Sequence, residues 1–388
     1  MRLRLFAGAG QAAIRRPREI TCFSYDEEHQ LRHDASSLRY YYPPLLPCDL
    51  SAGFDTFRHV DDSVDEHLDS LLDAIVEHEK TKGSKVETDI ITWRGMMTKI
   101  MVSPFSYLDD WEMNATVFQD TLFIEESHEK KLDSRQNQYT APAHPGAMSQ
   151  DLMSYWGYKF ETVALLDKPW SDATREDIES REKMVVSNYA QYCSIVRTGF
   201  GRVKIVIGGE VDAVQDFKPV DKSQQVNWVE LKTTALIQNE KDQVKFERKL
   251  LKFWAQSFLL GVPKIVVGYR NHQGLLERVE ELDTQAIPEK VRLQGRGLWD
   301  GQAYCLVGIV DIFLQGLKGV VVEEGVWKIR KREKSSVIEV YKAVETGHGD
   351  ILSAKFVEWR SQGLPQPQQR TQPSQPSQPM EQPQDGPT

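Results

Sequence analysis

Three carboxylates and one lysine stand on two short apolar segments near the middle of the chain. Glu210 and Asp212 lie in VKIVIGGEVDAV, and Glu230 and Lys232 lie in NWVELKTT. Within each pair the residues are two positions apart, so on an extended strand both side chains point to the same face. Two neighbouring strands of this kind would bring three carboxylates and an ammonium group to one point.

Such a group of charges is suited to one kind of chemistry. Unpaired carboxylates repel one another and are costly to bury. A divalent cation removes this repulsion, and hard oxygen ligands suit Mg²⁺ or Mn²⁺. A lysine beside the ion can orient or deprotonate water, as metal-dependent phosphodiester hydrolysis requires. The alternative is two edge strands with solvated charges, but the apolar surroundings of both pairs favour a metal site.

Three further residues are candidates for the same site, and each has a structural alternative. Glu161 is either a carboxylate at the rim of a helix or an additional metal ligand. Gln256 lies on an apolar helix face, where its amide needs a partner; a core contact, a ribose or a phosphate would satisfy it. Arg94, in ITWRGMMTKIM, forms either a structural ion pair or a bidentate clamp on a phosphate, with Lys99 adding charge.

Helical and strand patterns alternate around these residues. The spacing of apolar residues predicts helices over 150–166, 240–260 and 62–80, the last with a buried stripe of Val64, Leu68, Leu71, Leu72 and Ile75. We expect strands over 89–93, 203–214, 227–234, 264–270, 325–331 and 336–343. The polar segment 127–150 is typical of an exposed loop. The order of these elements predicts a mixed α/β fold.

Composition limits the class of protein. The chain has 388 residues, of which 40% are hydrophobic, so it can bury a substantial core. Its net charge is −9, so any RNA or DNA site must be a local basic patch. The four cysteines are widely separated, which argues against a zinc site or a disulfide framework and fits a reducing compartment. No apolar run is long enough to span a bilayer.

The two ends of the chain differ in composition from the middle. Residues 1–16 are rich in arginine and contain no acid; we expect a flexible basic arm, with a transit peptide as the weaker alternative. Residues 362–388 consist almost wholly of Gln, Pro and Ser, which predicts a disordered tail. The catalytic domain is therefore expected to be a single large unit over 17–361.

Six blocks in the chain match a known family. They are TWRG at 92–95, GYKFE at 157–161, CSIVRTGFG at 193–201, GEVD at 209–212, VELKT at 229–233 and the helix that contains Gln256. Together they resemble the PD-(D/E)XK nuclease core and, more narrowly, the DXO family of RNA 5′-end decapping enzymes. PREITCFSYD and SSLRYYYPP are similar to its fungal nuclear branch, which partners the nuclear 5′→3′ exoribonuclease. The resemblance spans about residues 17–360.

The resemblance implies a role for each matching residue. The divalent metal, Mg²⁺ or Mn²⁺ and expected as two ions, would be bound by Glu161, Glu210, Asp212, Glu230 and the Leu231 carbonyl. Asp212 would bridge the ions, and Lys232 would position the attacking water, so that Glu210, Asp212, Glu230 and Lys232 carry the catalysis. Substrate would be held by Arg94 and Gln256 at the RNA phosphates, with Trp93, Gly95, the Cys193 segment, Lys232 and, on a looser match, Glu66.

The family also implies a fold and a function. Its members have a mixed α/β domain with two sheets and flanking helices. They remove 5′-triphosphates, incompletely methylated caps and nicotinamide-dinucleotide caps from RNA, and some degrade RNA from the 5′ end. We therefore expect a nuclear, metal-dependent hydrolase of RNA 5′ ends that acts in quality control with the exoribonuclease. The alternatives are a mainly non-catalytic activator of the exoribonuclease and a DNA endonuclease on the same core.

Overall fold

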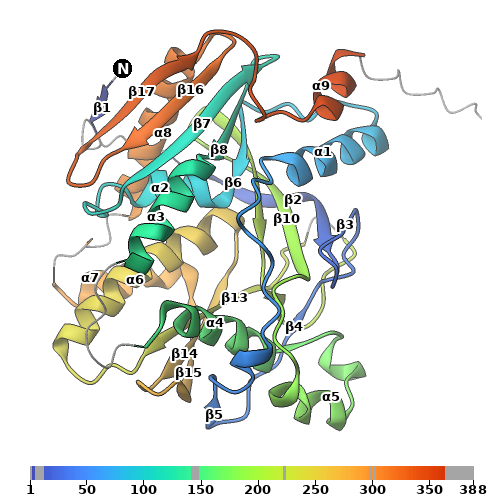
Figure 1. Ribbon diagram of the computed structural model, residues 1–388, viewed down its shortest axis with the longest axis vertical. Helices are drawn as coiled ribbons and strands as arrows, with labels where there is room; N and C mark the ends of the chain where they lie inside the picture. The colour runs from blue at the N-terminus through green and yellow to red at the C-terminus, as the bar shows by residue number, and fades with distance from the viewer. Residues whose placement is uncertain are drawn as a thin grey trace, which may run out of the picture.

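The structure is a computed structural model that describes residues 2–4, 13–140, 148–221, 224–296, 299 and 303–362 (Figure 1). Its strands form two sheets, one of ten strands and one of seven, and helices flank both. In Figure 1 the larger sheet fills the upper part of the molecule and the smaller sheet the lower part. The expected α/β architecture of two mixed sheets with flanking helices is therefore confirmed.

The ten-stranded sheet is mixed, because β6 runs parallel to both β8 and β11 while the other pairs are antiparallel. In spatial order its strands are β1 Arg2–Arg4, β17 Val337–Val344, β16 Val326–Lys331, β7 Trp111–Phe118, β8 Thr121–Glu126, β6 Ile90–Trp93, β11 Val203–Glu210, β10 Gln191–Phe200, β2 Ile14–Tyr25 and β3 Leu31–Arg32.

The seven-stranded sheet is centred on the parallel pair β13 and β14. In spatial order its strands are β5 Cys48–Asp49, β15 Leu275–Asp283, β14 Lys264–Arg270, β13 Trp228–Ala235, β12 Ala213–Val214, β4 Tyr40–Tyr41 and β9 Leu165–Leu166. Four of these strands have only two residues, so one side of β13 is paired along a small part of its length.

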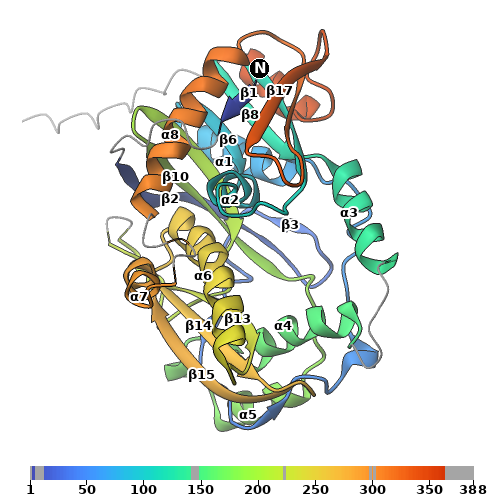
Figure 2. The same cartoon turned by 90° about the vertical axis from the view of Figure 1, so that its left-hand side faces the viewer.

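The helices pack around and between the sheets (Figures 1 and 2). They are α1 Asp69–Lys82, α2 Arg94–Val102, α3 His128–Thr140, α4 Gln150–Ala164, α5 Arg175–Glu179, α6 Glu240–Leu260, α7 Ile287–Leu293, α8 Ala303–Val320 and α9 Ala354–Ser361. Short 3₁₀ turns lie at Phe54–Thr56, Trp170–Asp172, Arg181–Lys183 and Thr284–Ala286. Within the described part of the chain, no helix is both long enough and apolar enough to cross a membrane.

Helices α4 and α6 cover opposite faces of the seven-stranded sheet. Val229 and Leu231 of β13 pack in one core cluster with Phe160 of α4. Trp228, whose side chain points the other way, packs in a second cluster with Trp254 of α6. Because side chains alternate along a strand, Glu230 and Lys232 point to the same side as Trp228. This alternation fixes where the charged residues of β13 emerge.

The two helices that carry candidate residues begin and end at recognisable signals. The hydroxyl of Ser149 accepts a hydrogen bond from the N–H of Leu152 at the start of α4. The side chain of Asn239 accepts one from the N–H of Asp242 at the start of α6, and Gly261, with φ of 73°, ends that helix in the left-handed conformation. The predicted helix over 240–260 is confirmed, and the one predicted over 150–166 is confirmed as far as Ala164, because Leu165–Leu166 form β9.

Two local expectations are wrong. The helix expected over 62–80 begins at Asp69, and Val64, expected in its buried stripe, is exposed. Asp61 and Asp65 accept hydrogen bonds from backbone N–H groups two residues on, which holds the preceding segment in turns. The segment 127–150, expected as a loop, contains α3. Its polar side chains form ion pairs instead of burying an apolar stripe, with Lys130 on Asp110 and Arg135 on Asp62.

The ends of the chain lie partly outside the described residues. The expected flexible arm, 1–16, differs from the structure in two places, because β1 pairs with β17 and β2 already begins at Ile14. Backbone hydrogen bonds to neighbouring strands hold these residues in the ten-stranded sheet. Residues 1, 5–12 and 363–388, including nearly all of the expected Gln/Pro-rich tail, lie outside the described residues.

A buried ion pair attaches α9 to α1 (Figure 1, upper right). Arg360 donates to both carboxylate oxygens of Glu79, at 2.9 and 2.6 Å, and both side chains are almost fully buried. Trp359 and the N–H of Val86 donate to the same carboxylate. Every lone pair of Glu79 thus faces a donor, which makes the burial of its charge tolerable.

We expect the Arg360→Ala variant to lose roughly 3–5 kcal/mol of unfolding free energy, because it leaves the Glu79 charge buried and poorly paired. Lys355→Ala is the matched control: it removes an exposed ion pair with Asp73 between the same two helices and should cost less than about 1 kcal/mol. Denaturant unfolding of both variants measures the difference. Equal losses would show that the Glu79 pair contributes no more than a surface contact.

Candidate functional site

The chain crosses from one sheet to the other between Glu210 and Ala213. Strand β11 ends at Glu210, Val211 donates its N–H to the carbonyl of Tyr192, and β12 begins at Ala213. The strand expected over 203–214 is therefore two strands in different sheets. The pairing between β10 and β11 ends where Cys193 lies opposite Glu210. From Ala213 on, the chain forms its backbone hydrogen bonds with β13 in the second sheet. Asp212 lies at this crossing.

Two glycines before the crossing permit close packing. A Cβ on Gly208 would lie 2.9 Å from side-chain atoms of Leu71 and Trp93. A Cβ on Gly209 would lie 2.9 Å from Leu260 of α6 and 3.0 Å from Arg94 of α2. Separations this short would force these neighbours apart. The GGE sequence thus lets α2 and α6 approach the backbone next to Glu210.

The short strand β12 leaves part of the edge of β13 open. It pairs only with Val229 and Trp228, and the next residue, Asp212, stands opposite Glu230. The side chain of Asp212 accepts the N–H of Leu231 at 2.6 Å, in place of a ladder partner. In an extended strand the C=O of a residue points to the same side as its N–H. The carbonyl of Leu231 therefore faces the same space as Asp212.

Glu230 is fully buried and held by two cations. Its carboxylate lies 2.7 Å from Nζ of Lys232 and 3.2 Å from Nη1 of Arg94. The same Arg94 nitrogen donates to the backbone carbonyl of Glu210 at 3.1 Å. Burial acts to raise the pKa of Glu230, but Arg94 and Lys232 outweigh burial and lower it. The structure therefore shows Arg94 in the ion pair that was one of its two interpretations.

The other three carboxylates have raised pKa values. Burial, followed by the charges of Asp212 and Glu210, raises the pKa of Glu161 well above its usual value. Burial raises the pKa of Glu210 as well, although Arg94 opposes the shift. Burial and the charge of Glu230 raise the pKa of Asp212 to about 7. These carboxylates lie close enough to destabilise one another when ionised.

The donor set fits a divalent cation in its chemistry. Three half-buried carboxylates with raised pKa values and the Leu231 carbonyl are hard oxygen ligands, and a positive ion between them would reverse the cause of the shifts. Within the described residues, no three acidic, histidine or cysteine side chains already enclose an ion position. Glu230 faces Arg94 and Lys232, so its ligation stays a prediction that requires its carboxylate to turn.

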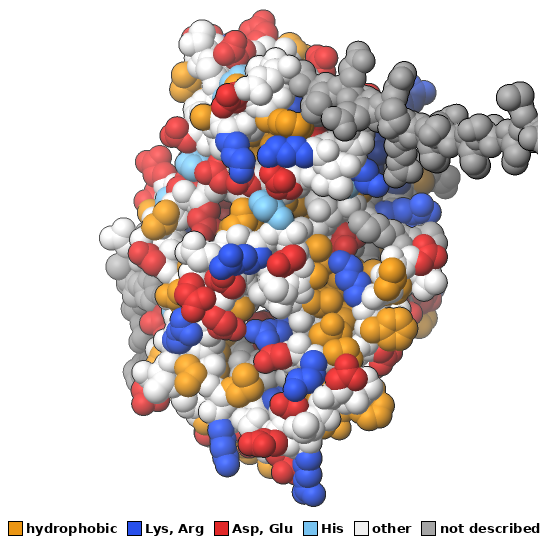
Figure 3. Space-filling view, turned by 90° about the vertical axis from the view of Figure 1, so that its right-hand side faces the viewer, with side chains coloured by type: hydrophobic (Ala, Val, Ile, Leu, Met, Phe, Trp, Pro, Cys, Tyr) orange, Lys and Arg blue, Asp and Glu red, His pale blue; other side chains and the backbone are white. Residues whose placement is uncertain are grey.

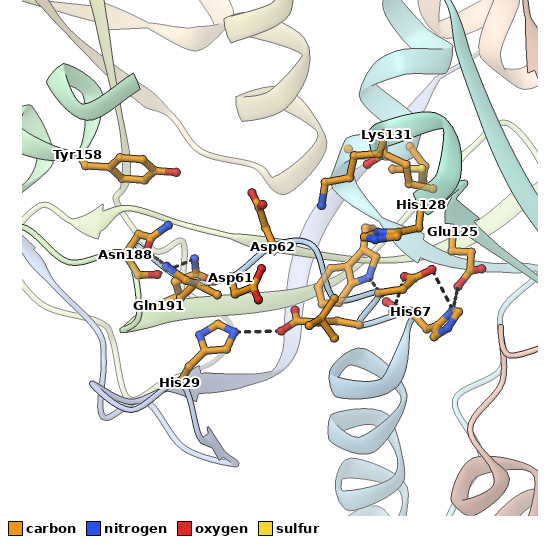
Figure 4. Close-up of a pocket in the computed structure, with 18 residues that line it drawn as sticks. His29, Asp61, Asp62, His67, Glu125, His128, Lys131, Tyr158, Asn188 and Gln191 are labelled. Carbon is orange, nitrogen blue, oxygen red and sulfur yellow. Dashed lines mark hydrogen bonds and ion pairs between the residues drawn. The ribbon is translucent and has the colours of Figure 1, made fainter. Parts of the chain in front are cut away.

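Two cavities open beside these carboxylates. One, of about 420 Å³, is lined by Glu161, Glu210 and Asp212, and we call it the Glu161 cavity. The other, of about 440 Å³, we call the His29 cavity; Figure 4 shows the residues that line it. Tyr158 and Gln191 line both, so the cavities adjoin. Each volume is in the range of pockets that bind small molecules.

The His29 cavity is lined mainly by acidic and aromatic groups. Lys131 and His128 of α3 lie on one side of it, and Tyr158, Asn188 and Gln191 lie on the other (Figure 4). Two of its histidines contact carboxylates at 3.1 Å, His29 at Glu66 and His67 at Glu125. The acidic residues on its wall are Asp61, Asp62, Asp65, Glu66, Glu125 and Glu126.

The remaining predicted residues take different places. Trp93, Gly95 and Glu66 line the His29 cavity, which fits contact with a substrate there. Cys193 is buried in the core opposite Glu210, with its thiol pKa raised well above the usual value by burial, and it lines neither cavity. Gln256 is half-buried on α6, and its amide has no hydrogen-bond partner in the described part of the chain. The substrate contacts of all these residues stay predictions.

Sequence reasoning missed several residues of the two cavities. Tyr158, in the GYKFE block, carries a phenol whose pKa burial raises, and Gln191 precedes the Cys193 block. Their positions next to recognised blocks are a signal that could have identified them. His67 and Glu125 lie far apart in sequence and meet only in the folded chain, so no local pattern indicates their contact.

The chain matches a family model described as RAI1 like PD-(D/E)XK nuclease over residues 15–357. The chain belongs to this family. It is therefore an enzyme of the nuclease class, a hydrolase. The fold, the resemblance and the converging charged residues predicted from the sequence agree with this membership.

Relatives and solved structures are similar over most of the chain. The Decapping nuclease RAI1 of Emericella nidulans is 60% identical, covering 90% of this chain and 94% of its own length. That of Aspergillus fumigatus is 58% identical with the same coverage. Candida albicans Rai1, solved in complex with pU5 and Mn²⁺, superposes with a TM-score of 0.87 at 31% identity, covering 93% of this chain and 99% of that one.

We expect a divalent cation to raise the melting temperature, and more so at high pH. Because the Asp212 pKa is raised from 3.8 to about 7, the ion-free folded state keeps a proton that the unfolded state loses. Ion-free stability should therefore fall as pH rises from about 4 to about 7, and a bound cation should offset this loss. Thermal melts with and without Mn²⁺ at both ends of this window measure the effect, with Asp212→Asn as the control. An equal shift at both pH values would contradict it.

Proposed function

We propose that this chain is a decapping nuclease that hydrolyses the 5′ ends of RNA with the help of a divalent cation. The observation that carries the proposal is the convergence of Glu161, Glu210 and Asp212, with raised pKa values, at the open edge of β13 in a chain of this nuclease family. Lys232 and Arg94 stand at the same point. Carboxylates that line the Glu161 cavity and two cations paired with Glu230 thus lie around the same stretch of β13.

The metal ligands in this proposal are Glu161, Glu210, Asp212, Glu230 and the Leu231 carbonyl. A divalent cation bound there would stabilise negative charge on the phosphate and activate a water. Two ions, with Mg²⁺ or Mn²⁺ as the element, are the finer form of the proposal. The metals in the solved relatives support it: Mn²⁺ with C. albicans Rai1 and a calcium ion with (3′-NADP)⁺ in Scheffersomyces stipitis Rai1.

Lys232 acts as a donor and not as a base. Burial acts to lower its pKa, but the negative charges of Glu230 and Asp212 outweigh burial and raise it, so the amine stays protonated. The ammonium can then donate a hydrogen bond to a water or to a phosphate oxygen and hold it in place. Arg94, whose pKa is also raised, keeps Glu230 ionised and adds positive charge where a phosphate oxygen becomes more negative.

Attraction of RNA to this acidic chain depends on local charge. The face shown in Figure 3 carries acidic and basic side chains interspersed, in keeping with the net charge of −9. A polyanion gains little from such a surface as a whole. The groups that can hold a phosphate at the reaction centre are the cations Lys232 and Arg94 and the neutral amide of Gln256.

The finer substrates are 5′-triphosphates, incompletely methylated caps and nicotinamide-dinucleotide caps. One centre can act on all of them, because the scissile phosphate is common and the leaving group alone changes. The Glu161 cavity, which Arg39 and Arg58 also line, offers room for that group. RNAs that differ only in their 5′ group, offered to the protein with Mg²⁺, would rank these substrates.

We expect Asp212→Asn to reduce hydrolysis of 5′-triphosphate RNA by at least a hundredfold while the fold stays intact. The change removes a charge from the ion site but keeps an acceptor for the N–H of Leu231. Product release measured by chromatography, together with circular dichroism, tests this. A variant that turns over substrate at the wild-type rate would reject the mechanism, and cleavage of single-stranded DNA in preference to RNA would favour a DNA endonuclease.

The second candidate function is activation of a partner. The similarity of PREITCFSYD and SSLRYYYPP to the fungal nuclear branch supports binding to the nuclear 5′→3′ exoribonuclease, and with it a nuclear location. We expect the Asp212→Asn variant to bind the exoribonuclease as well as the wild type does, because Asp212 lies inside a cavity. Co-precipitation measures this, and loss of binding by the folded variant would argue against separable functions.

A further inference from the structure

Helix α6 carries a stripe of lysines on one side. Lys245, Lys249 and Lys252 follow one another at intervals of four and three residues, and Gln256 comes four residues later. On a helix these positions lie one above the other. The buried residues Phe246, Leu250 and Trp254 face the seven-stranded sheet and define another side. We call Lys245, Lys249 and Lys252 the α6 lysine stripe.

Two of the three acidic residues of α6 point elsewhere. Glu240 and Glu247 both lie near Arg296, at 3.7 and 2.5 Å. The backbone of Glu247 also accepts the indole N–H of Trp299, on the flank where α7 packs. Figure 2 shows α7 on one flank of α6 and α4 on the opposite side. The charges of Glu240 and Glu247 are therefore neutralised on the α7 flank, away from the stripe, and Asp242 is the one acidic residue of α6 beside it.

The stripe itself is poorly neutralised. Among the described residues, Lys249 and Lys252 form no ion pair, and Lys245 has a carboxylate only at 3.8 Å, on Asp242. Arg270, at the end of β14, belongs to the same cluster: it adds to the lowering of the Lys249 pKa, behind burial and ahead of Lys245. Arg270 stacks on Trp156 of α4 at 4.0 Å, and its Nε has no hydrogen-bond partner in the described chain. Like charges held together without a carboxylate are unfavourable unless an anion binds.

The stripe leads to the catalytic carboxylates. Leu260, at the end of α6, contacts Gly209 immediately before Glu210, and α6 packs against α2, which begins at Arg94. From Gln256 to Lys245 the helix rises by roughly 16 Å. The His29 cavity, on the other side, is lined by acidic groups that repel phosphates. A polyanion bound at the catalytic centre is therefore favoured along α6 and disfavoured in the His29 cavity.

We propose that the α6 lysine stripe, with Arg270, binds the phosphate backbone of the RNA body that continues beyond the scissile 5′ phosphate. This inference rests on the proposed function and adds a direction to it: the RNA body leaves along α6, and the 5′ group lies in the Glu161 cavity, which Arg39 and Arg58 also line. Three spaced cations and a stacked arginine bind successive phosphates without reading bases. Affinity should then grow with RNA length and fall with salt.

The test is binding of single-stranded RNA by the Lys249→Gln/Lys252→Gln variant in an Asp212→Asn background, which prevents consumption of the RNA. Fluorescence anisotropy with 5′-triphosphate oligouridylates of increasing length is the readout. We expect the longest RNA to lose roughly tenfold in affinity and the dinucleotide to lose less. The slope of log K against log salt should become shallower by about 0.7 for each lysine removed.

Two further variants make the outcome specific. Lys82→Gln/Arg202→Gln removes the same charge from two exposed residues at the end of α1 and in the β10–β11 turn, and it should leave the slope unchanged. Lys249→Arg/Lys252→Arg should restore binding. Equal losses in the Lys82 and Lys249 variants would overturn the inference in favour of net charge. The inference would also be overturned if the Lys249→Gln/Lys252→Gln variant lost the same affinity for RNAs of every length. It would be overturned as well if that variant lost exoribonuclease binding while its RNA affinity stayed unchanged.

The two proposals can fail separately. Hydrolysis of 5′ ends by the unmodified protein tests the catalytic proposal, whereas anisotropy reports RNA binding without turnover. Stripe-dependent binding in a protein that hydrolyses no 5′ end would reject the catalytic proposal and keep the stripe. Hydrolysis of 5′ ends by a protein whose RNA affinity does not depend on the α6 lysine stripe would keep the catalytic proposal and reject the stripe.

Discussion

The buried carboxylate of Glu230 joins the two sheets. Glu230 and Lys232 belong to β13 of the smaller sheet, whereas Arg94 follows β6 of the larger sheet and also holds the carbonyl that ends β11. A charge with no exposure is tolerable only while both cations stay in place. The same contacts that close the core therefore also fix the positions of Lys232 and Arg94.

Around this contact the structure separates charge by sign. Burial and neighbouring carboxylates raise the pKa values of Glu161, Glu210 and Asp212, whereas Arg94 and Lys232 lower the pKa of Glu230. Acidic groups continue into the His29 cavity, and the lysines of the α6 lysine stripe, of which only Lys245 has a carboxylate partner among the described residues, continue along α6. A metal cation would lie among carboxylates, whereas a phosphate and the RNA backbone would lie beside positively charged side chains. In an acidic chain, this local arrangement replaces an overall basic surface.

The sequence predicted the helices α4 and α6, the strand β13 and the charged residues that meet beside it. These succeeded because apolar spacing and capping residues are local signals. The predictions failed where contacts between residues far apart in the sequence determine the local structure. A continuous strand over 203–214 looks favourable by its side chains, yet partners in two sheets divide it at Asp212. Helix α3 has no apolar stripe and is held by Asp62 and Asp110, which lie elsewhere in the sequence. The His67–Glu125 contact likewise has no local signature.

The brevity of β12 limits how this chain can vary in length. Were β12 longer by a few residues, its backbone would pair with β13 beyond Val229 and take up the N–H and C=O of Leu231 that now face the cavity. Were one residue inserted between Glu210 and Ala213, Asp212 would lose its place opposite Glu230. Insertions and deletions should therefore be selected against at the crossing between the sheets, yet tolerated next to the exposed residues 220 and 221, which lie between β12 and β13.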